Sequence, residues 1–169
     1  MSTLVYFAYG SNMSSARIRH RVNSASVVSA AHLPEHRLRF HKKSIDGSAK
    51  CDIEHTNRPS DRVYGVVYTI HRSEKRLLDA CEGLGNGYEE KDVGIYLPDG
   101  KVITANTYYA THIDPSLRPY HWYKEHVLRG AREHALPGNH IAMIEAIESV
   151  ADPDPSNHTA ELSIYCELD

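Results

Sequence analysis

Short apolar runs separated by turn residues fill the first two thirds of the chain. The first run, at 4–8, ends before Gly10 and leads into a helical pattern at 13–19, which predicts a strand, a tight turn and a helix. We expect Ser11 or Asn12 to cap this helix, because a short polar side chain can accept an amide hydrogen of the first turn.

Further strands are expected from the same pattern, at 25–33, 36–41, 49–54, 62–70, 88–96 and 101–110. The run 62–70 has β-branched and aromatic residues on both faces, which predicts a central strand that is covered on two sides. Gly65 in this run leaves room for close packing. A turn at 98–100 makes the last two strands a hairpin.

Helical patterns are concentrated later in the chain, at 73–82, 119–136 and 139–148. In the first of these, Leu77, Leu78 and Cys81 are expected on one buried face. Glu82 then lies at the end of the helix, beside the glycine-rich segment 83–87, where a glycine can terminate the helix.

The order of the elements predicts the fold class. Strands come first and helices last, without regular βαβ alternation, which is typical of an α+β fold. Six or seven short strands can curl into a small barrel, which leaves no exposed sheet edge. A length of 169 residues predicts one domain over 1–169. Its tail, 150–169, is rich in turn residues and is expected to be irregular, with a final strand at 162–166.

Composition narrows the partners. Lys and Arg total 19 against 22 Asp and Glu, a formal charge of −3, so no nucleic acid or anionic membrane is expected as a partner. The first residues lack a basic segment before an apolar run, which predicts neither a signal peptide nor a membrane span and therefore a cytoplasmic protein. Three cysteines without C-x-x-C spacing are expected to be reduced thiols. Twelve histidines without a ligand motif predict no metal site.

Two features are candidates for chemistry. The turn at 9–12, between a strand and a helix, presents backbone amides at a positive helix end and could hold an anion, or it could simply be a capped helix without a ligand. Glu82 could act as a base beside glycines that allow a ligand to approach closely, or it could be an ordinary surface glutamate at a helix end. Physical chemistry alone leaves both alternatives open.

Four ordered blocks of sequence resemble the gamma-glutamylcyclotransferase family over residues 4–148, and their order makes the match more specific than any single block. Asn12 completes the Y-G-S-N form of the turn, which resembles the gamma-glutamylcyclotransferases proper. The blocks are Tyr6–Asn12, Val63–Tyr68, Leu78–Gly83, and Tyr123 through Pro137.

The resemblance implies a small mixed β-barrel with flanking helices and a metal-free, cofactor-free reaction. In that reaction the α-amine of a γ-glutamyl amide attacks its own γ-carbonyl and releases 5-oxoproline and an amine or amino acid. Glu82 matches the catalytic glutamate, and Tyr123 matches a substrate-contacting tyrosine that would otherwise be read as core packing. Tyr88 is matched to another such tyrosine, although the loop that precedes it is one residue shorter than in the family. The substrate-binding turn matches Tyr6, Phe7, Ala8, Tyr9, Gly10, Ser11 and Asn12.

Two other functions remain as alternatives. One is a noncatalytic module that binds an acidic metabolite in the same pocket. The other keeps the cyclisation but acts on a γ-glutamyl-protected biosynthetic intermediate. The expected partner is a small γ-glutamyl molecule, and a homodimer is left open.

Overall fold

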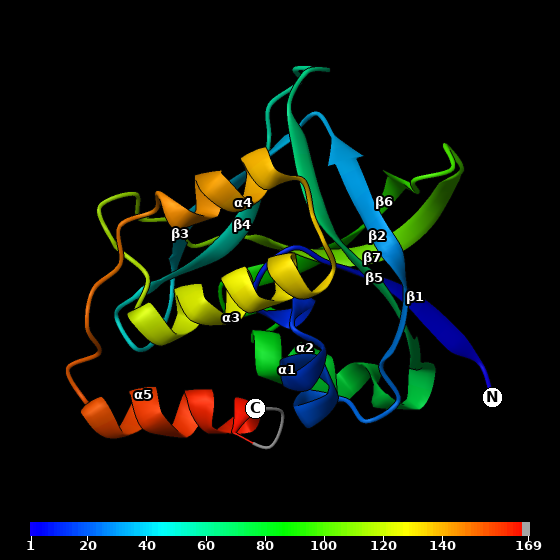
Figure 1. Ribbon diagram of the computed structural model, residues 1–169. Coiled ribbons are helices and arrows are strands. Elements are labelled where there is room, and N and C mark those ends of the chain that lie inside the picture. Colours follow the sequence, from blue (N-terminus) through cyan, green and yellow to red (C-terminus); the bar gives the residue numbers. More distant parts are fainter. Residues whose placement is uncertain (167–169) are drawn as a thin grey trace.

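Seven strands form where the short apolar runs predict them, in the computed structural model of the protein, which describes residues 1–166 (Figure 1). Their bounds lie within about two residues of the predicted ranges. The strands are β1 (Thr3–Ala8), β2 (Ser26–Pro34), β3 (His36–Lys43), β4 (Ala49–His55), β5 (Arg62–His71), β6 (Tyr88–Tyr96) and β7 (Val102–Ala110).

Five of these strands close into a barrel in the order β1-β5-β2-β6-β7. Neighbouring strands are antiparallel, except that β1 meets β7 in parallel where Tyr6 lies opposite Asn106, so the barrel is mixed. The expected barrel of six or seven strands is therefore too large. Glu35 has a left-handed backbone (φ 60°), and after it β3 and β4 form a separate two-stranded sheet whose Phe40 packs edge-on against Tyr123.

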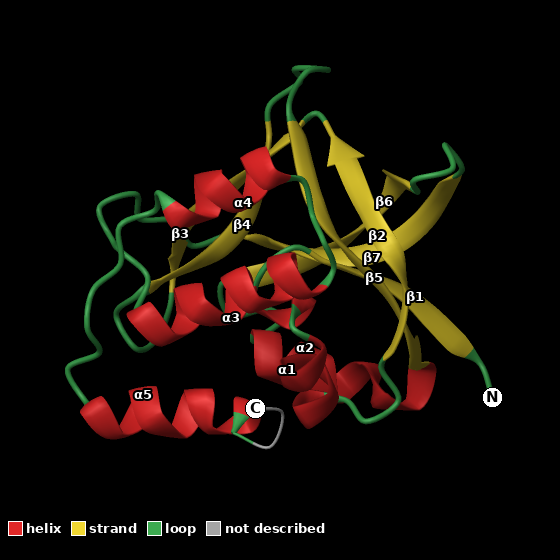
Figure 2. Ribbon diagram, viewed as in Figure 1, coloured by secondary structure: helices red, strands yellow, loops and turns green. Residues whose placement is uncertain are grey.

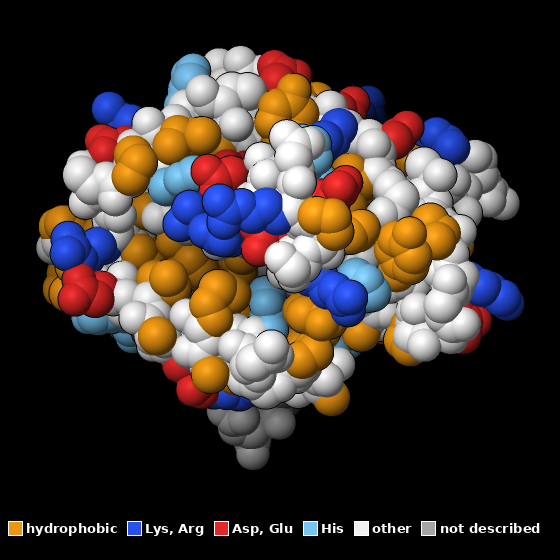
Figure 3. Space-filling view, turned by 90° about the horizontal axis from the view of Figure 1, so that it is seen from above, with side chains coloured by type: hydrophobic (Ala, Val, Ile, Leu, Met, Phe, Trp, Pro, Cys, Tyr) orange, Lys and Arg blue, Asp and Glu red, His pale blue; other side chains and the backbone are white. Residues whose placement is uncertain are grey.

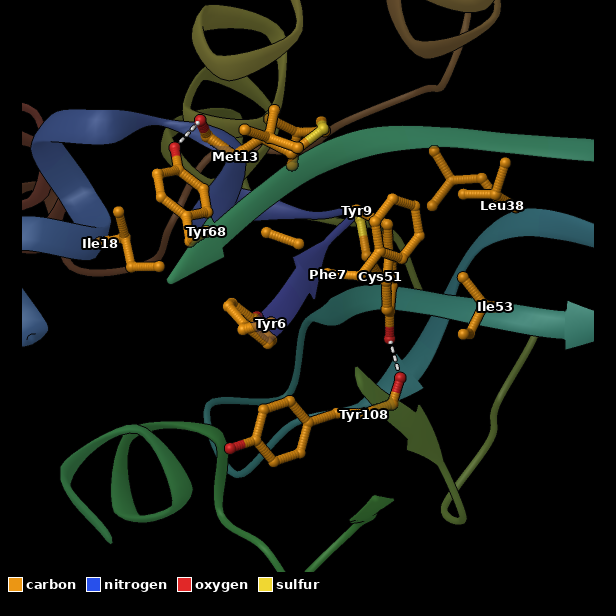
Figure 4. Close-up of a cluster of buried hydrophobic side chains, with 14 of the residues drawn as sticks. Tyr6, Phe7, Tyr9, Met13, Ile18, Leu38, Cys51, Ile53, Tyr68 and Tyr108 are labelled. Carbon is orange, nitrogen blue, oxygen red and sulfur yellow. Dashed lines mark hydrogen bonds between the residues drawn. The ribbon is translucent and has the colours of Figure 1, made fainter. Parts of the chain in front are cut away.

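The predicted central position of β5 is confirmed, since it pairs with β1 on one side and β2 on the other. The close packing predicted at Gly65 is confirmed as well. A Cβ atom built there would lie 2.3 Å from the Ala8 carbonyl oxygen and 2.7 Å from the Phe7 ring. Aromatic side chains fill the core beneath this contact, as Figure 4 shows for Tyr6, Phe7 and Tyr68.

The helices lie on one side of the barrel and around its end (Figure 2). α1 and α2 lie next to each other, and α5 packs against α3. The helical segments are η1 (Ser11–Met13), α1 (Ser15–Arg21), η2 (Arg72–Glu74), α2 (Lys75–Glu82), α3 (His121–Glu133), α4 (Gly138–Glu145), α5 (Pro155–Leu162) and η3 (Ser163–Tyr165).

The predicted cap of the first helix is wrong. Ser11 and Asn12 belong to the short 3-10 turn η1, and α1 begins after it with Ser14 as its cap, whose hydroxyl accepts from the Arg17 amide. The extra turn frees the side chains of Ser11 and Asn12 for contacts elsewhere in the molecule.

The predicted buried face of α2 is also wrong in part. Leu78 is fully buried, but Leu77 is 45% exposed and Cys81 is exposed. Residues four apart share a helix face, so the inward face that carries Leu78 also carries Glu82. This orientation of α2 about its axis points the Glu82 carboxylate towards the turn that follows β1.

The expected strand at 162–166 is absent, and residues 155–165 form α5 and η3 instead. Pro155 is the first residue of α5, and the Asp154 side chain caps the Ser156 amide at 3.0 Å. Proline is well suited to the first position of a helix, because its missing N–H has no helical partner there. The prediction of an irregular tail is therefore wrong for residues 155–165.

Candidate active site

The turn after β1 is fixed by α3, which packs directly on it. A Cβ atom at Gly130 of α3 would lie 2.5 Å from backbone atoms of Met13 and Ser14. The first helical hydrogen bonds are donated by the amides of Met13 and Ser14 to the carbonyls of Gly10 and Ser11. The amides of Ser11 and Asn12 precede these bonds, so the helix itself supplies them with no acceptor.

Glu82 reaches this turn from the C-terminal end of α2. Its Oε1 atom accepts hydrogen bonds from Asn12 Nδ2 and from Arg21 Nη1, each at 2.9 Å. Asn12 Nδ2 also lies 3.2 Å from the Tyr6 hydroxyl, and Arg21 Nη1 donates to Asn12 Oδ1 at 3.1 Å. The turn, α1 and α2 therefore meet at one carboxylate, whose side chain is 16% exposed.

An inner cavity of about 20 Å³ lies between Glu82 and the turn. That volume is on the scale of one water-sized group. Glu82 is the one carboxylate among its lining residues in the described chain, 1–166. The lining consists of Tyr6, Tyr9, Gly10, Ser11, Asn12, Cys51, Glu82, Tyr88, Tyr108 and Tyr123.

The other ionisable groups of the inner cavity are held in their neutral forms. Burial raises the pKa of the Cys51 thiol and of the Tyr88 and Tyr123 hydroxyls above their usual values. Burial likewise raises the pKa of Tyr6 and Tyr108. None of these groups is a base at neutral pH, so Glu82 is the group of this lining that can accept a proton.

The tyrosines are fixed by hydrogen bonds to backbone. The Tyr123 hydroxyl accepts from the Cys51 amide at 2.9 Å, and the Tyr88 hydroxyl donates to the Cys51 carbonyl at 2.5 Å. The Tyr9 hydroxyl donates to the Tyr108 carbonyl at 2.7 Å (Figure 4). These contacts give the cavity a wall of rigid aromatic rings.

An outer cavity of about 600 Å³ continues from the inner one, and Ser11, Glu82, Tyr88 and Tyr123 line both. Its lining is rich in positive charge. The cations are Arg17, Arg21, Lys42 and Lys50, and Glu82 is again the one carboxylate lining it within residues 1–166.

Arg17 connects the turn to the C-terminal helix. Its Nε donates to the Ser11 hydroxyl at 3.1 Å, and its Nη1 contacts Glu161 of α5 at 2.6 Å and His126 of α3 at 3.0 Å. A hydrogen bond from His126 and the charge of Arg17 lower the pKa of Glu161 to about 2. Arg17 and His126 thus keep the Glu161 carboxylate ionised, and Arg17 connects it to Ser11 of the turn.

Most of the predicted site residues come together at the inner cavity: Tyr6, Tyr9, Gly10, Ser11, Asn12, Glu82, Tyr88 and Tyr123. Phe7 and Ala8 do not line it, since their side chains are fully buried in the core. Sequence reasoning missed Arg21, Cys51 and Tyr108. Of these three, only Arg21 could have been found from the sequence. It lies four residues after Arg17, which places both cations on one face of the helix after the turn.

Residues 1–166 contain neither a candidate metal cluster nor a candidate membrane-spanning helix. No group of three or more His, Cys, Asp or Glu side chains in this part of the chain could hold a metal ion. None of its helices combines the length and the apolar character needed to cross a bilayer.

The chain is similar to the AIG2-like family and to gamma-glutamylcyclotransferases. The AIG2-like family matches residues 62–144. The chain is 31% identical to gamma-glutamylcyclotransferase of Homo sapiens over 95% of this chain and 84% of the human protein, and 33% identical to that of Bos taurus over 86% and 79%. A solved structure described as gamma-glutamyl cyclotransferase superposes with a TM-score of 0.83 at 31% identity and covers 90% of this chain and 92% of its own.

Proposed function

The chain belongs to the gamma-glutamylcyclotransferase family and is an enzyme of that kind, and we propose that Glu82 moves the proton in its reaction. The reaction closes a γ-glutamyl amide into 5-oxoproline and releases the amine or amino acid that was bound to the γ-carbon. The noncatalytic binding module is not favoured, because the relatives that match most of the chain are named as enzymes.

Glu82 transfers a proton at two points of the reaction. The Glu82 carboxylate takes a proton from the α-ammonium of the substrate, whose nitrogen then attacks the γ-carbonyl carbon. When the tetrahedral intermediate collapses, the bond from the γ-carbon to the leaving nitrogen breaks, and Glu82 returns a proton to that nitrogen. Because the attack is intramolecular, the enzyme gains most from folding the substrate into the reactive geometry.

The inner cavity suits the oxygen that becomes negative. A volume of about 20 Å³ admits one oxygen-sized group beside the amides of the turn. Amides at the start of a helical turn stabilise such a charge, and they need no reorganisation during the reaction. The outer cavity then has room for the leaving group.

The observation that carries this proposal is the position of Glu82. It is the one carboxylate of the inner cavity within residues 1–166, and both of its described donors, Asn12 and Arg21, bind the same oxygen. The other oxygen, Oε2, faces no described donor and is available to the substrate.

Three free cysteines also favour a reducing, cytoplasmic setting for the enzyme.

Replacing the carboxylate tests the proposal directly. We expect Glu82→Gln to lower 5-oxoproline release from γ-glutamyl amides by about 100- to 10,000-fold, the usual contribution of general acid–base catalysis. The neutral amide is nearly the same size, so the circular dichroism spectrum and the melting temperature should stay close to those of the parent. Glu89→Gln, on an exposed position of β6, is the matched control. Comparable activity in the Glu82 variant would exclude the proton-transfer role.

A further inference from the structure

Lys42 is a cation that the reaction as described does not use. It lies on β3, is only 5% exposed and lines the outer cavity but not the inner one. Lysine is seldom buried without a partner, because removing an ammonium from water is costly. A buried lysine at a cavity wall therefore needs an explanation.

The strand geometry accounts for its orientation. The pairing of β3 with β4 shifts register between Phe40 and Lys42, so that His41 is the extra residue of a β-bulge. Phe40, His41 and Lys42 are buried in succession, although the side chains of a regular strand alternate between its two faces. Bulges commonly redirect a side chain beside an active site, and this one places Lys42 at the cavity.

The ammonium group sits over aromatic and glycine surface. Lys42 Nζ lies 4.7 Å from the centre of the Tyr88 ring. A Cβ atom at Gly87 would come within 2.9 Å of Lys42 Cε and 3.2 Å of Nζ, so the tip of the lysine packs directly on the glycine backbone. The ring face of Tyr88 attracts the cation without neutralising it.

The other cations of the outer cavity already have carboxylate partners. Arg21 pairs with Glu82, Arg17 with Glu161, and Lys50 with Asp46, at 2.9, 2.6 and 2.9 Å respectively. Within the part of the chain that the structure describes, Lys42 makes no salt bridge. Burial lowers the pKa of Lys42, whereas the charge of Glu82 opposes that shift. Its positive charge is thus available to an anion that enters the cavity.

We infer that Lys42 is a specificity-determining residue, whose ammonium group binds a carboxylate on the leaving group and thereby sets how much faster γ-glutamyl derivatives of α-amino acids react than those of neutral amines. This inference rests on the proposed function, because it assumes that the glutamyl end occupies the turn and Glu82. What lies beyond the scissile bond then extends into the outer cavity, the part that Lys42 lines.

A matched pair of substrates isolates the charge. γ-Glutamyl-alanine and γ-glutamyl-alaninamide differ only in whether the leaving group carries a carboxylate or a neutral amide. We expect the parent enzyme to release 5-oxoproline from the acid with a kcat/KM about 10- to 100-fold higher than from the amide, since a hydrogen bond to a charged group has that value. Lys42→Met should bring the ratio close to one, mainly by slowing the acid.

Two variants keep the test independent of folding. Lys42→Arg keeps the charge and should keep the preference for the acid. Lys43→Met removes the neighbouring charge from an exposed position of β3 and should leave the ratio unchanged. The melting temperature of each variant is measured alongside its kinetics.

The outcomes separate the two proposals. No 5-oxoproline from either substrate would contradict the proposed function, and the role of Lys42 would fall with it. Turnover of both substrates at equal efficiency by the parent enzyme would overturn the role of Lys42 alone. An equal loss on both substrates in Lys42→Met would overturn it too, because it would place the lysine on the carboxylate of the glutamyl part.

Discussion

Arg21 and Asn12 determine how the Glu82 carboxylate is oriented. Both donate to Oε1 at 2.9 Å, and Arg21 also donates to the Asn12 side chain at 3.1 Å. The three side chains form a closed set of contacts, and the Arg21 and Glu82 side chains are 19% and 16% exposed. A group that transfers a proton must be held to within a fraction of an ångström, so we assign Arg21 a positioning role.

We expect Arg21→Gln to lower kcat for 5-oxoproline formation by about 10- to 100-fold with a smaller change in KM, because the substrate site remains while the base loses its orientation. Arg21→Lys should recover part of the loss, since an ammonium keeps the charge but not the forked geometry of the guanidinium. The measurement is steady-state kinetics on a γ-glutamyl amino acid.

Arg19→Gln is the matched control, because Arg19 lies on the same helix and its side chain makes one hydrogen bond within residues 1–166, to the Ala25 carbonyl at 3.4 Å. It should leave kcat unchanged. A loss confined to the melting temperature in Arg21→Gln, with kcat preserved, would assign Arg21 a purely structural role.

The sequence predicts the turn and Glu82 better than it predicts their neighbours. Asn12 and Glu82 lie in blocks that can be recognised along the chain, and each block carries its own local structure. Cys51 and Tyr108 enter the same cavity only through the pairing of β4 and β7 with the rest of the fold. Their contribution depends on strand register and barrel closure, which a single sequence does not specify.

At the scale of elements, the contact between α3 and η1 controls the shape of the site. Gly130 faces the backbone of Met13 and Ser14, and no flexible side chain lies between them. Backbone atoms cannot move aside as a side-chain tip can, so added volume at Gly130 must push the helix and the turn apart.

We therefore expect Gly130→Ala to destabilise the fold by about 1–3 kcal/mol, despite the better helix propensity of alanine, and to reduce activity by displacing the turn. Gly138→Ala is the control. A Cβ atom at Gly138 meets nothing within 4 Å, so this change should be neutral or slightly stabilising. Urea denaturation of both variants measures the difference, and equal stability of the two would contradict the close approach.

The elements themselves were predicted with uneven success, for physical reasons. Strand runs are short and bounded by turn residues, so their positions follow from local pattern. The inward face of α2 could not be predicted from local pattern, because Leu77 and Leu78 are adjacent and leave the rotation of the helix about its axis ambiguous. In the folded protein only Leu78 of the two is buried. The α5 helix was missed because Asp154 and Pro155 start a helix at the point where proline alone suggests a break.

At the scale of the whole molecule, most charged side chains lie on the surface, whereas some of the histidines are buried. Figure 3 shows Lys, Arg, Asp and Glu side chains interspersed over one face, in keeping with a net charge of only −3. Four histidines of residues 1–166 are buried, His36, His41, His126 and His140, and the last two lie on helices. His126 on α3 faces Arg17, Glu161 and Tyr165, and His140 on α4 stacks edge-on against Tyr64.

These two histidines predict acid-sensitive stability. Burial lowers the pKa of both His126 and His140 to about 4, against about 6.5 in an unfolded chain. As the pH falls below 6.5 the unfolded chain binds protons first, so the free energy of unfolding falls. The contribution is complete above about pH 6.5 and is lost between pH 6.5 and 4, by about 3 kcal/mol for each histidine at pH 4.

His140→Phe separates the two contributions. The phenyl ring can keep the contact with Tyr64, and no proton acceptor remains, so the variant should lose less stability between pH 7 and pH 4 than the parent does, by about the 3 kcal/mol assigned to His140. His140 Nε2 is buried without a hydrogen-bond partner in the described part of the chain, so its removal breaks no bond. His158→Gln, at an exposed position on α5, should behave like the parent. Urea midpoints at the two pH values give the comparison, and an unchanged pH dependence in His140→Phe would show that His140 takes up its proton equally in the folded and unfolded chain.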